Sequence, residues 1–544
     1  MPKRRTVCSL EWLCLETVAK NIHRIWAKAC AENDLDGHHV GSVAGPYIWL
    51  RKRGTATDSL AQKLFKLVEE GNCLNRPILR FLLVPPLTVL SLRKCPKLVI
   101  RSVANIIAVR CKNLSSLNIE GCCRIPAATL VNLVKALPSL SRLNLSETRC
   151  NARVLAAVGS HCKQLLELNV GDCRRLSSVC LLHLAYDPAT GSLRSQALQV
   201  LRARYLMGKP LLDCMIRPLV FLLLALRSLT VLDHAFILDA VCAIYRREFD
   251  SAPVAPKFPS LEQLARRRMS AHSGRGLTLT LTELDKVASS CLPIAFAVCP
   301  HLADVTLSLG GNPGFGQDFA SWRHISCLSL QCNDGSSWDV GNLLPMAAAL
   351  GAQLHCLSLD TFFCDDASSF WTLLGHCPNL TSFWVALLPP EDCASDEEET
   401  VEPLEGNFSP TPHQFPHLQY FSLMYFDADD TLPPQDKAVF TACLVSLLRH
   451  SPQLESLFLY CLPFSLDRMF EQVLEPPGRA LTHLQKLSLI QAKVSGSTIH
   501  LLLSSENQLS SLRLPGCSCI SRADYDDFLR RVRSEGLELD ISWE

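Results

Sequence analysis

The chain has 544 residues, a formal net charge of +1, 48% apolar residues and 26 cysteines. A charge this close to zero provides no general basic field for nucleic acid and no acidic excess that would keep the whole chain unfolded. The longest apolar run (219–226) is too short to span a bilayer and charged residues interrupt the stretch after MPKRRTV, so we expect a cytoplasmic or nuclear protein with no membrane or nucleic-acid partner.

The first predicted element is a helix over the segment SLEWLCLETV, residues 9–18. Ser9 is a suitable N-cap, and Glu11 lies where the positive end of the helix dipole favours an acid. Four apolar residues follow the spacing i, i+3, i+4 and i+8 and therefore share one narrow face: Leu10, Leu13, Cys14 and Val18.

A second helix is predicted after the segment AGPYIWL, which contains Pro46. Asp58 is a candidate cap and Gly71 a stop signal. Leu60 and Leu64 begin its apolar face, which continues through 67 and 68. We assign residues 1–84 to a small helical module.

A repeat begins at residue 87 and fits the pattern L-x-x-L-x-L-x-x-C/T. Its first four copies start 27, 26 and 25 residues apart: LTVLSLRKC (87–95), LSSLNIEGC (114–122), LSRLNLSET (140–148) and LLELNVGDC (165–173). The pattern indicates a strand, a turn and a helical return. It resembles the cysteine-containing leucine-rich repeats. The resemblance implies an α/β solenoid over residues 85–544, with a curved parallel sheet inside and helices outside.

Later repeats are longer, and we expect their strands to begin at Leu198, Leu229, Leu261, Leu302, Ile325, Leu354, Leu380, Leu418, Leu454, Leu484 and Leu509, with a last strand from 537. Most cysteines recur at one repeat phase, as at Cys111, Cys162, Cys299 and Cys377. Small thiols at such positions pack as apolar side chains, so we expect reduced cysteines without a metal.

An insertion rich in acids and prolines occupies residues 389–412. Such a composition cannot bury apolar surface, so we expect a solvated loop; the alternative is a segment that is phosphorylated or binds a basic partner. The glycine-rich stretch 310–318 lacks the spacing of a phosphate-binding loop and is interpreted as a turn. No catalytic arrangement stands out, and we expect neither an enzyme nor a cofactor.

Residues that alternate outward from the strands form the open face of the sheet. In the early repeats this face is polar, whereas in later repeats it is aromatic. The predicted substrate-binding residues are Trp384, Tyr420, Met424, Phe458 and Tyr460. Exposed aromatic residues with methionine are typical of binding hot spots. The alternatives are that a loop covers them, or that the register is shifted by one residue.

The helix at 9–18 resembles the BC box, the Elongin-binding helix of von Hippel–Lindau-box and SOCS-box proteins. By this resemblance Leu10 is the main anchor in a groove of Elongin C, with Leu13, Cys14 and Val18 behind it. A box before leucine-rich repeats is similar to zyg-type substrate receptors of cullin-RING ubiquitin ligases. It implies Elongin B/C and a cullin as partners, the cullin contact falling at Pro46, Leu60 and Leu64, and a protein substrate on the repeats.

Three alternatives stay open at this stage. The first is an F-box-type receptor that binds the Skp adaptor, since many F-box proteins carry the same repeat. The second is a protein-interaction scaffold with no ligase role. The third concerns the helix at 9–18 alone, which would cover the apolar edge of the first repeat without binding a partner.

Overall fold

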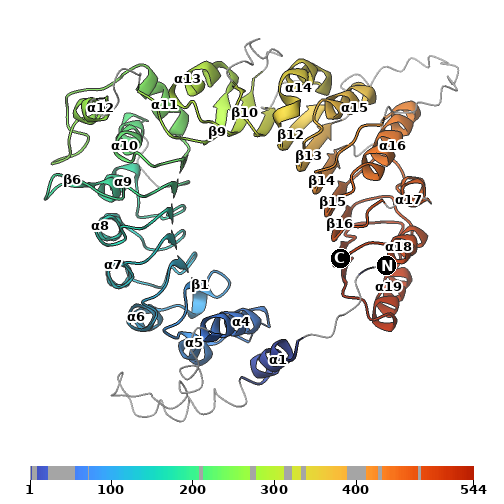
Figure 1. The fold of residues 1–544 in the computed structure, drawn as a ribbon, viewed down its shortest axis with the longest axis horizontal. Helices are drawn as coiled ribbons and strands as arrows, with labels where there is room; N and C mark the ends of the chain where they lie inside the picture. The colour runs from blue at the N-terminus through green and yellow to red at the C-terminus, as the bar shows by residue number, and fades with distance from the viewer. Residues whose placement is uncertain are drawn as a thin grey trace. The chain divides into compact units, whose positions relative to one another are not determined.

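The computed structural model describes residues 2, 9–22, 56–71, 73–206, 212–269, 277–310, 322–332, 338–388, 412–426, 432–475 and 480–543. These residues fall into two compact units (Figure 1). The N-terminal unit consists of Val7–Leu284 and Ile294–His301; the C-terminal unit consists of Met1–Thr6, Asp285–Pro293 and Leu302–Glu544. This division groups the first helices with the early repeats, and the boundary expected at residue 84 stays a prediction.

The N-terminal unit contains a six-stranded parallel sheet, and three helices precede it among the described residues. The sheet order is β1-β2-β3-β4-β7-β8, so each repeat adds a strand beside the previous one. Its strands are β1 (Val89–Ser91), β2 (Ser116–Asn118), β3 (Arg142–Asn144), β4 (Glu167–Asn169), β7 (Val200–Arg202) and β8 (Val231–Asp233). Its helices are α1 (Leu10–Ile22), α4 (Ala56–Glu70), α5 (Arg76–Leu82), α6 (Arg101–Arg110), α7 (Ala127–Ala136), α8 (Ala152–His161), α9 (Ser178–Ala185), α10 (Leu212–Ala225), α11 (Ile237–Tyr245), α12 (Leu261–Met269) and, across the boundary, α13 (Leu292–Val298).

The C-terminal unit contains most of a ten-stranded parallel sheet in the order β18 to β9. Its strands are β9 (Glu283–Ala288), β10 (Asp304–Leu309), β11 (Cys327–Cys332), β12 (Cys356–Phe363), β13 (Ser382–Leu388), β14 (Tyr420–Tyr425), β15 (Ser456–Tyr460), β16 (Lys486–Ile490), β17 (Ser511–Arg513) and β18 (Asp540–Ser542). Its α-helices are α14 (Leu344–Leu350), α15 (Ala367–Gly375), α16 (Pro434–Arg449), α17 (Asp467–Leu474), α18 (Gly496–Ser504) and α19 (Arg522–Ser534). The helices lie along one face of the sheet (Figure 1).

Buried leucines hold each repeat to the next. Leu117, Leu143 and Leu168 are register partners on β2, β3 and β4, and all three are buried. The residues on either side of each leucine point to the opposite face. The strand-turn-helix repeat forms a continuous core in each unit, which confirms the predicted leucine-rich-repeat fold class.

Each early repeat turns away from its strand through a residue with left-handed backbone conformation. The φ angle is +73° at Gly121, +55° at Glu147 and +56° at Asp172. The N–H groups of these residues donate to carbonyls of the following repeat, Ser146, Gly171 and Arg204 respectively. The turn therefore extends the hydrogen bonding of the sheet beyond the strands, although two of these three positions lack the glycine that this φ favours.

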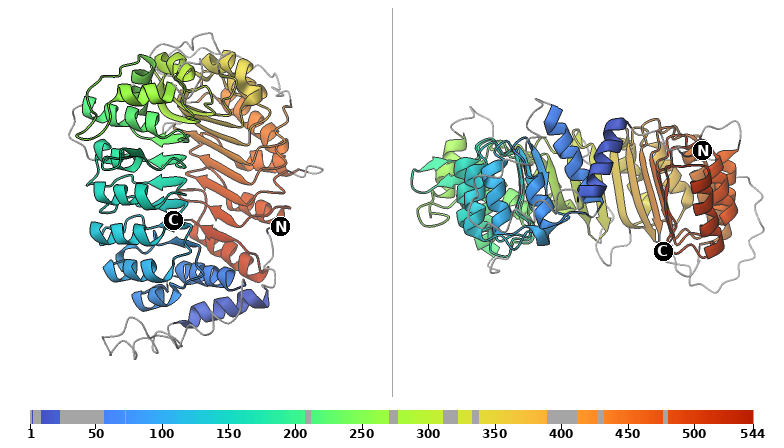
Figure 2. Two further views of the ribbon diagram at one scale, coloured as in Figure 1. Left: turned by 60° about the vertical axis from the view of Figure 1, so that its left-hand side comes forward. Right: turned by 90° about the horizontal axis from the view of Figure 1, so that it is seen from below.

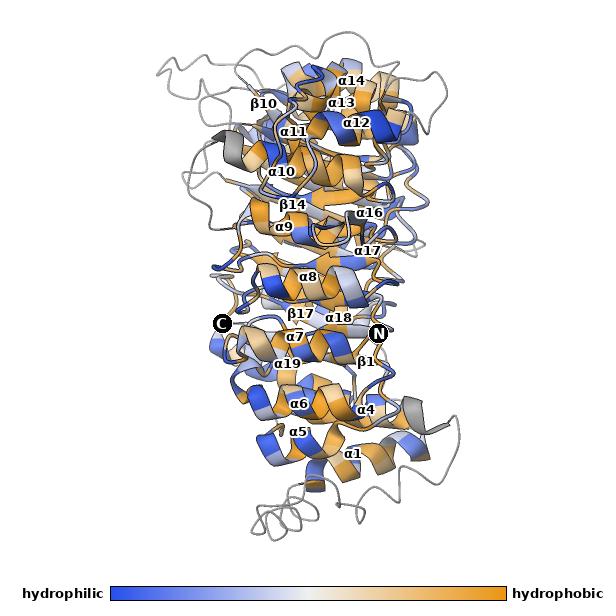
Figure 3. Ribbon diagram, turned by 90° about the vertical axis from the view of Figure 1, so that its left-hand side faces the viewer, coloured by the Kyte–Doolittle hydropathy of each residue, from blue (hydrophilic) through white to orange (hydrophobic). Residues whose placement is uncertain are grey.

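The prediction of a strand beginning at Leu261 is wrong, because this residue starts helix α12. Arg268 of α12 is buried and donates hydrogen bonds to the carbonyls of Leu223 and Thr278. These bonds hold a helix whose residues are mostly hydrophilic (Figure 3). Because no strand occurs among the described residues between β8 and β9, the parallel strands form two sheets where a single one was predicted.

The cysteines at the predicted repeat phase are buried at helix ends or just beyond them. Cys162 follows α8, and burial raises the pKa of its thiol to about 12. Burial has the same effect on Cys377. Among the described residues, no group of three His, Cys, Asp or Glu side chains is arranged to hold a metal, and no helix has the length and apolarity needed to cross a membrane.

Candidate functional site

Helix α1 starts as the sequence predicts. The hydroxyl of Ser9 accepts the N–H of Trp12 at 3.2 Å, and the carbonyl of Ser9 accepts the N–H of Leu13 at 3.0 Å. The first bond satisfies one of the N–H groups that a helix start leaves without a partner, and the second is the first regular hydrogen bond of the helix. The first turn of α1 is thus held by hydrogen bonds between residues of the segment 9–18 itself.

One side of α1 packs against α4 (Figure 2). Ala19 and Ile22 are buried on this side. At the other end of α1, the Nζ atom of Lys63 on α4 donates to Oε1 of Glu11 at 2.8 Å. Both charged side chains are about half-exposed, so the pair orients the two helices more than it stabilises them.

The opposite side of α1 presents the predicted adaptor-binding residues. Leu10 is 78% exposed, and Leu13 and Cys14 are also exposed. Val18 lies at the flank of this stripe and is half-buried. We name Leu10, Leu13 and Cys14 the apolar stripe of α1. A partner that binds a helix in a groove requires accessible apolar residues of this kind. A helix that only covers the repeats would bury them.

Helix α4, not α1, covers the first repeat. The side-chain amide of Gln62 donates to the carbonyl of Val89 on β1 at 2.8 Å. Leu64 is only 6% exposed and belongs to the buried face of α4, so its side chain is not presented to a cullin. Leu60 is half-buried, and Pro46 lies outside the described residues. Of the three residues predicted to contact a cullin, Leu60 is therefore the one that is both described and partly accessible.

The aromatic residues predicted to bind substrate lie together on the open face of the ten-stranded sheet. Register pairs Trp384 with Ser422, Tyr420 with Ser456, and Met424 with Tyr460. The neighbouring positions along these strands, such as Phe421 and Leu457, are buried on the helix side. We name Trp384, Tyr420, Met424, Phe458 and Tyr460 the aromatic surface. All five are half-buried, so the register is the one predicted, and their binding role stays a prediction.

Large and small side chains alternate across this surface. Along one row, Ser358, Trp384, Ser422, Phe458 and Ser488 follow each other on five adjacent strands. Ser422 and Ser488 are buried, although they point to the open face, because larger neighbours flank them. This alternation gives each aromatic ring room on a sheet whose strands are only about 4.8 Å apart.

Ring contacts connect the strands of the aromatic surface. The rings of Tyr420 and Phe458 are 5.2 Å apart between centroids. Tyr460 meets Phe426 edge-on at 6.0 Å. Phe426 is 42% exposed and was missed by the sequence analysis, although it continues the alternation two positions after Met424. These contacts limit the motion of the rings and reduce the entropy cost of binding.

Charged residues at both sides of the aromatic surface were also missed. Asp304 on β10 and Asp360 on β12 precede it, and Lys486 on β16 and Arg513 on β17 follow it. Burial raises the pKa of Asp360, and burial together with Asp285 raises the pKa of Asp304. The sequence does indicate that all four point outward, because they occupy outward positions of the repeat. Their order across the sheet follows only from the register of the strands.

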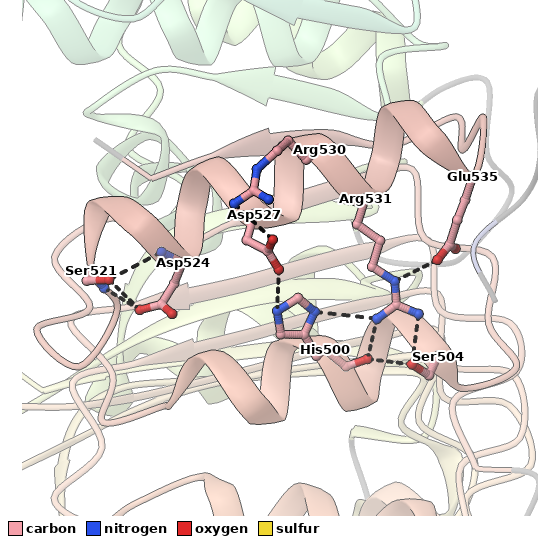
Figure 4. Close-up of polar contacts among 8 residues, drawn as sticks. All are labelled: His500, Ser504, Ser521, Asp524, Asp527, Arg530, Arg531 and Glu535. Atoms are coloured by element: carbon pink, nitrogen blue, oxygen red, sulfur yellow. Dashed lines mark hydrogen bonds and ion pairs between the residues drawn. The ribbon is translucent and has the colours of Figure 1, made fainter.

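A polar cluster between α18 and α19 has residue types found in hydrolases, but not their geometry (Figure 4). Nε2 of His500 lies 3.1 Å from Oδ2 of Asp527. The hydroxyl of Ser504, however, donates to the carbonyl of His500 at 2.7 Å and not to its ring. Arg531 donates to both the His500 carbonyl and the Ser504 hydroxyl. The cluster joins two helices and provides no activated nucleophile.

No protein-family model matches this chain. Solved structures similar to it include that of Rad7 with Elc1 from yeast, at 15% identity and TM-score 0.38 over 95% of this chain and 96% of that one. A leucine-rich-repeat-containing protein of Legionella pneumophila is similar at 15% identity and TM-score 0.29, over 53% of this chain and 89% of its own. A Bacteroides fragilis protein is similar at 15% identity and TM-score 0.27, over 45% and 66% respectively. At these scores the description of the fold rests on the strands and helices given above.

Proposed function

We propose that this protein is the substrate-recognition subunit of an Elongin B/C–cullin–RING ubiquitin ligase. The observation that supports it most is the division of α1 into two sides. One side packs on α4, while the apolar stripe of α1 faces away from it with Leu10 78% exposed. Several apolar residues at helical spacing on an exposed face are what a partner recognises when it binds a helix in a groove.

The stripe has the chemistry for such recognition. Burying one leucine side chain in a partner groove contributes roughly 1.5–3 kcal/mol. Leu13 adds a second apolar contact, and Cys14 is small enough for close approach of the groove wall. The helix is already formed and capped at Ser9, so less conformational entropy is lost on binding than for an unfolded peptide.

In this proposal the repeats bind the target protein, and the aromatic surface is the part of the sheet that does so. The chain itself carries no catalytic step, because ubiquitin transfer is performed by the other subunits. Its contribution is to hold a target protein in the same assembly as the ubiquitin-conjugating enzyme. Bringing both reactants together converts an encounter in solution into a reaction within one complex.

Co-purification tests the adaptor assignment. The full chain is expressed with Elongin B/C and, separately, with the Skp adaptor, and captured through a tag. We expect recovery of Elongin B/C only. Leu10→Ser with Cys14→Phe should abolish it, since one change removes the anchor and the other overfills the groove. Lys20→Ala, on the same helix and also exposed, is the matched control and should leave recovery unchanged.

Three results would contradict the proposal. Recovery of the Skp adaptor would favour the F-box alternative. Recovery of neither adaptor would favour a scaffold. Equal recovery with the wild-type chain and the double variant would show that Elongin B/C contacts another part of the chain.

A further inference from the structure

We propose that the open face of the ten-stranded sheet binds polypeptide segments with a cationic residue, an apolar centre and an anionic residue in that spatial order. This inference rests on the proposed function, since such a segment would be the recognition element of the target protein. It goes further by giving the chemistry of that element, which follows from the order of charges across the strands.

The open face changes its chemistry from one side to the other. On the side of β10 and β12 it carries the carboxylates of Asp304 and Asp360. The aromatic surface occupies β13, β14 and β15. On the side of β16 and β17 it carries the cations of Lys486 and Arg513, both exposed, and the last strand, β18, adds the exposed carboxylate of Asp540 beyond them. The strands are register neighbours throughout, so this order is fixed by the sheet.

Four of the charges on this face have no ionic partner among the residues that the structure describes. Lys486 and Arg513 form no ion pair with any described residue, and neither do the carboxylates of Asp304 and Asp360. Burial raises the pKa of Asp360, because its charged form is poorly solvated there. A cation brought by a partner supplies the compensation that this carboxylate lacks. The anions and cations thus favour opposite charges at opposite ends of one partner segment.

The apolar middle determines what joins those two charges. Tyr420 and Phe458 contact each other, and Tyr460 contacts the exposed ring of Phe426. Aromatic groups that stay partly accessible favour aliphatic or aromatic side chains of a partner, whose burial provides most of the binding free energy. An entirely charged partner would leave these rings in water, and an entirely apolar one would leave the four charges without partners.

The sheet also sets the length of the segment. Asp360 on β12 and Lys486 on β16 are four strand positions apart, which corresponds to roughly 19 Å at about 4.8 Å per strand. Asp360 also lies four residues beyond Cys356, the residue of β12 in register with Lys486, which adds roughly 13 Å along the strand direction. The direct distance is therefore roughly 23 Å, which an extended polypeptide covers in about seven residues. We therefore expect the cationic and anionic residues of the target segment to be separated by about seven positions, with apolar residues between them.

Fluorescence polarisation with three labelled synthetic peptides tests the inference on the full chain. All three have the same Leu-Trp-Leu centre and charged residues about seven positions apart. One carries lysine and glutamate, one carries two lysines, and one carries two glutamates. We expect the lysine–glutamate peptide to bind about fivefold more tightly than either of the others, as expected for one additional exposed ion pair.

Reversing one charge of the protein distinguishes binding at this face from a general electrostatic attraction between peptide and protein. In Lys486→Glu, we expect the two-lysine peptide to become the tightest binder. Arg468→Glu makes the same change of charge on α17, which lies on the helix side of the sheet, and should leave the order of the three peptides unchanged. Phe458→Ala should weaken all three peptides about equally.

Some outcomes would overturn the inference. These are equal affinity for the three peptides, or the same effect from Lys486→Glu and Arg468→Glu. Sedimentation equilibrium showing a dimer that Phe458→Ala dissociates would identify a second copy of the chain as the occupant instead. The peptide assay contains no adaptor, so failure to recover Elongin B/C would reject the proposed function without changing this result.

Discussion

Lys63 donates to Glu11 at 2.8 Å across 52 residues of sequence, joining α4 to the first turn of α1. Glu11, the neighbour of Leu10, is thus on the side of α1 that contacts α4, whereas Leu10 projects away from it. Leu10 and Ile22 belong to the same helix but have opposite environments, one 78% exposed and the other buried. This difference makes the two sides of α1 separable by mutation.

Leu10→Ala should leave the free energy of unfolding within about 0.5 kcal/mol of the wild type, because an exposed side chain loses few contacts. Ile22→Ala should reduce it by about 2–4 kcal/mol through the loss of buried methyl groups. Urea unfolding followed by circular dichroism measures both. Similar losses in the two variants would show that Leu10 is buried in solution.

Phe458→Ala should leave the protein folded, because the ring is half-buried on the open face. Phe421→Ala is the matched variant on the helix side, where the ring is buried and stacks with Phe383 at 5.8 Å. It should cost about 3–5 kcal/mol. Thermal unfolding of both variants distinguishes them, and a large loss of stability in Phe458→Ala would place that residue in the core.

The left-handed turns give a prediction about backbone strain. Glu147 is exposed with φ of +55°, so Glu147→Gly should stabilise the N-terminal unit by up to about 1 kcal/mol. Gly121→Ala at φ of +73° should destabilise it by about 1 kcal/mol. A Cβ atom added at Gly121 makes only ordinary van der Waals contacts, so the loss of stability would come from backbone strain. Chemical unfolding would contradict this if both changes destabilised the unit equally.

His234 makes the stability of the N-terminal unit depend on pH. Its Nδ1 accepts the N–H of Phe236 at 3.2 Å, so its Nε2 carries the proton and donates to the Ser178 hydroxyl at 3.2 Å. Burial lowers the pKa of His234 to about 4, whereas Asp233 opposes this shift. The unfolded chain therefore takes up a proton below about pH 6.5 that the folded one does not.

The resulting loss of stability begins as the pH falls through about 6.5 and is complete near 4. Between pH 7.5 and pH 5, His234 should contribute about 2 kcal/mol of destabilisation. His234→Gln removes the titration and should lose less stability than the wild type over this range. Urea midpoints at both pH values provide the comparison, and identical pH dependence in the two proteins would show that His234 does not titrate in this way.

The sequence predicts the parts of this fold that repeat. Leucines at fixed spacing, as at Leu117 and Leu143, predict strands because a parallel sheet buries the same position in each repeat. Leu261 has the same apolar character, but Arg266, Arg267 and Arg268 follow it within one helix. One of the two carbonyls that Arg268 binds, that of Leu223, lies 45 residues earlier in the chain, so local sequence did not indicate this helix.

The two candidate sites differ in how far the sequence determines them. The apolar stripe of α1 follows from helical spacing alone, since Leu10, Leu13 and Cys14 are close along the chain. Which side of α1 faces α4 depends on contacts between the two helices, the one with Lys63 among them, and spacing does not predict these contacts. On the sheet, the alternation placed Trp384 and Phe458 on the open face. The positions of Asp360 and Lys486 at opposite sides of that face required the register of strands separated by more than a hundred residues.

Hydrogen exchange of the full chain with and without Elongin B/C tests the central claim most directly. Binding through the apolar stripe should slow exchange of the amides of α1 and leave the strands β2, β3 and β4 unchanged, because only the bound helix gains protection. Protection that appears elsewhere while residues 10–18 exchange at the same rate would contradict the account of α1 as the adaptor-binding helix.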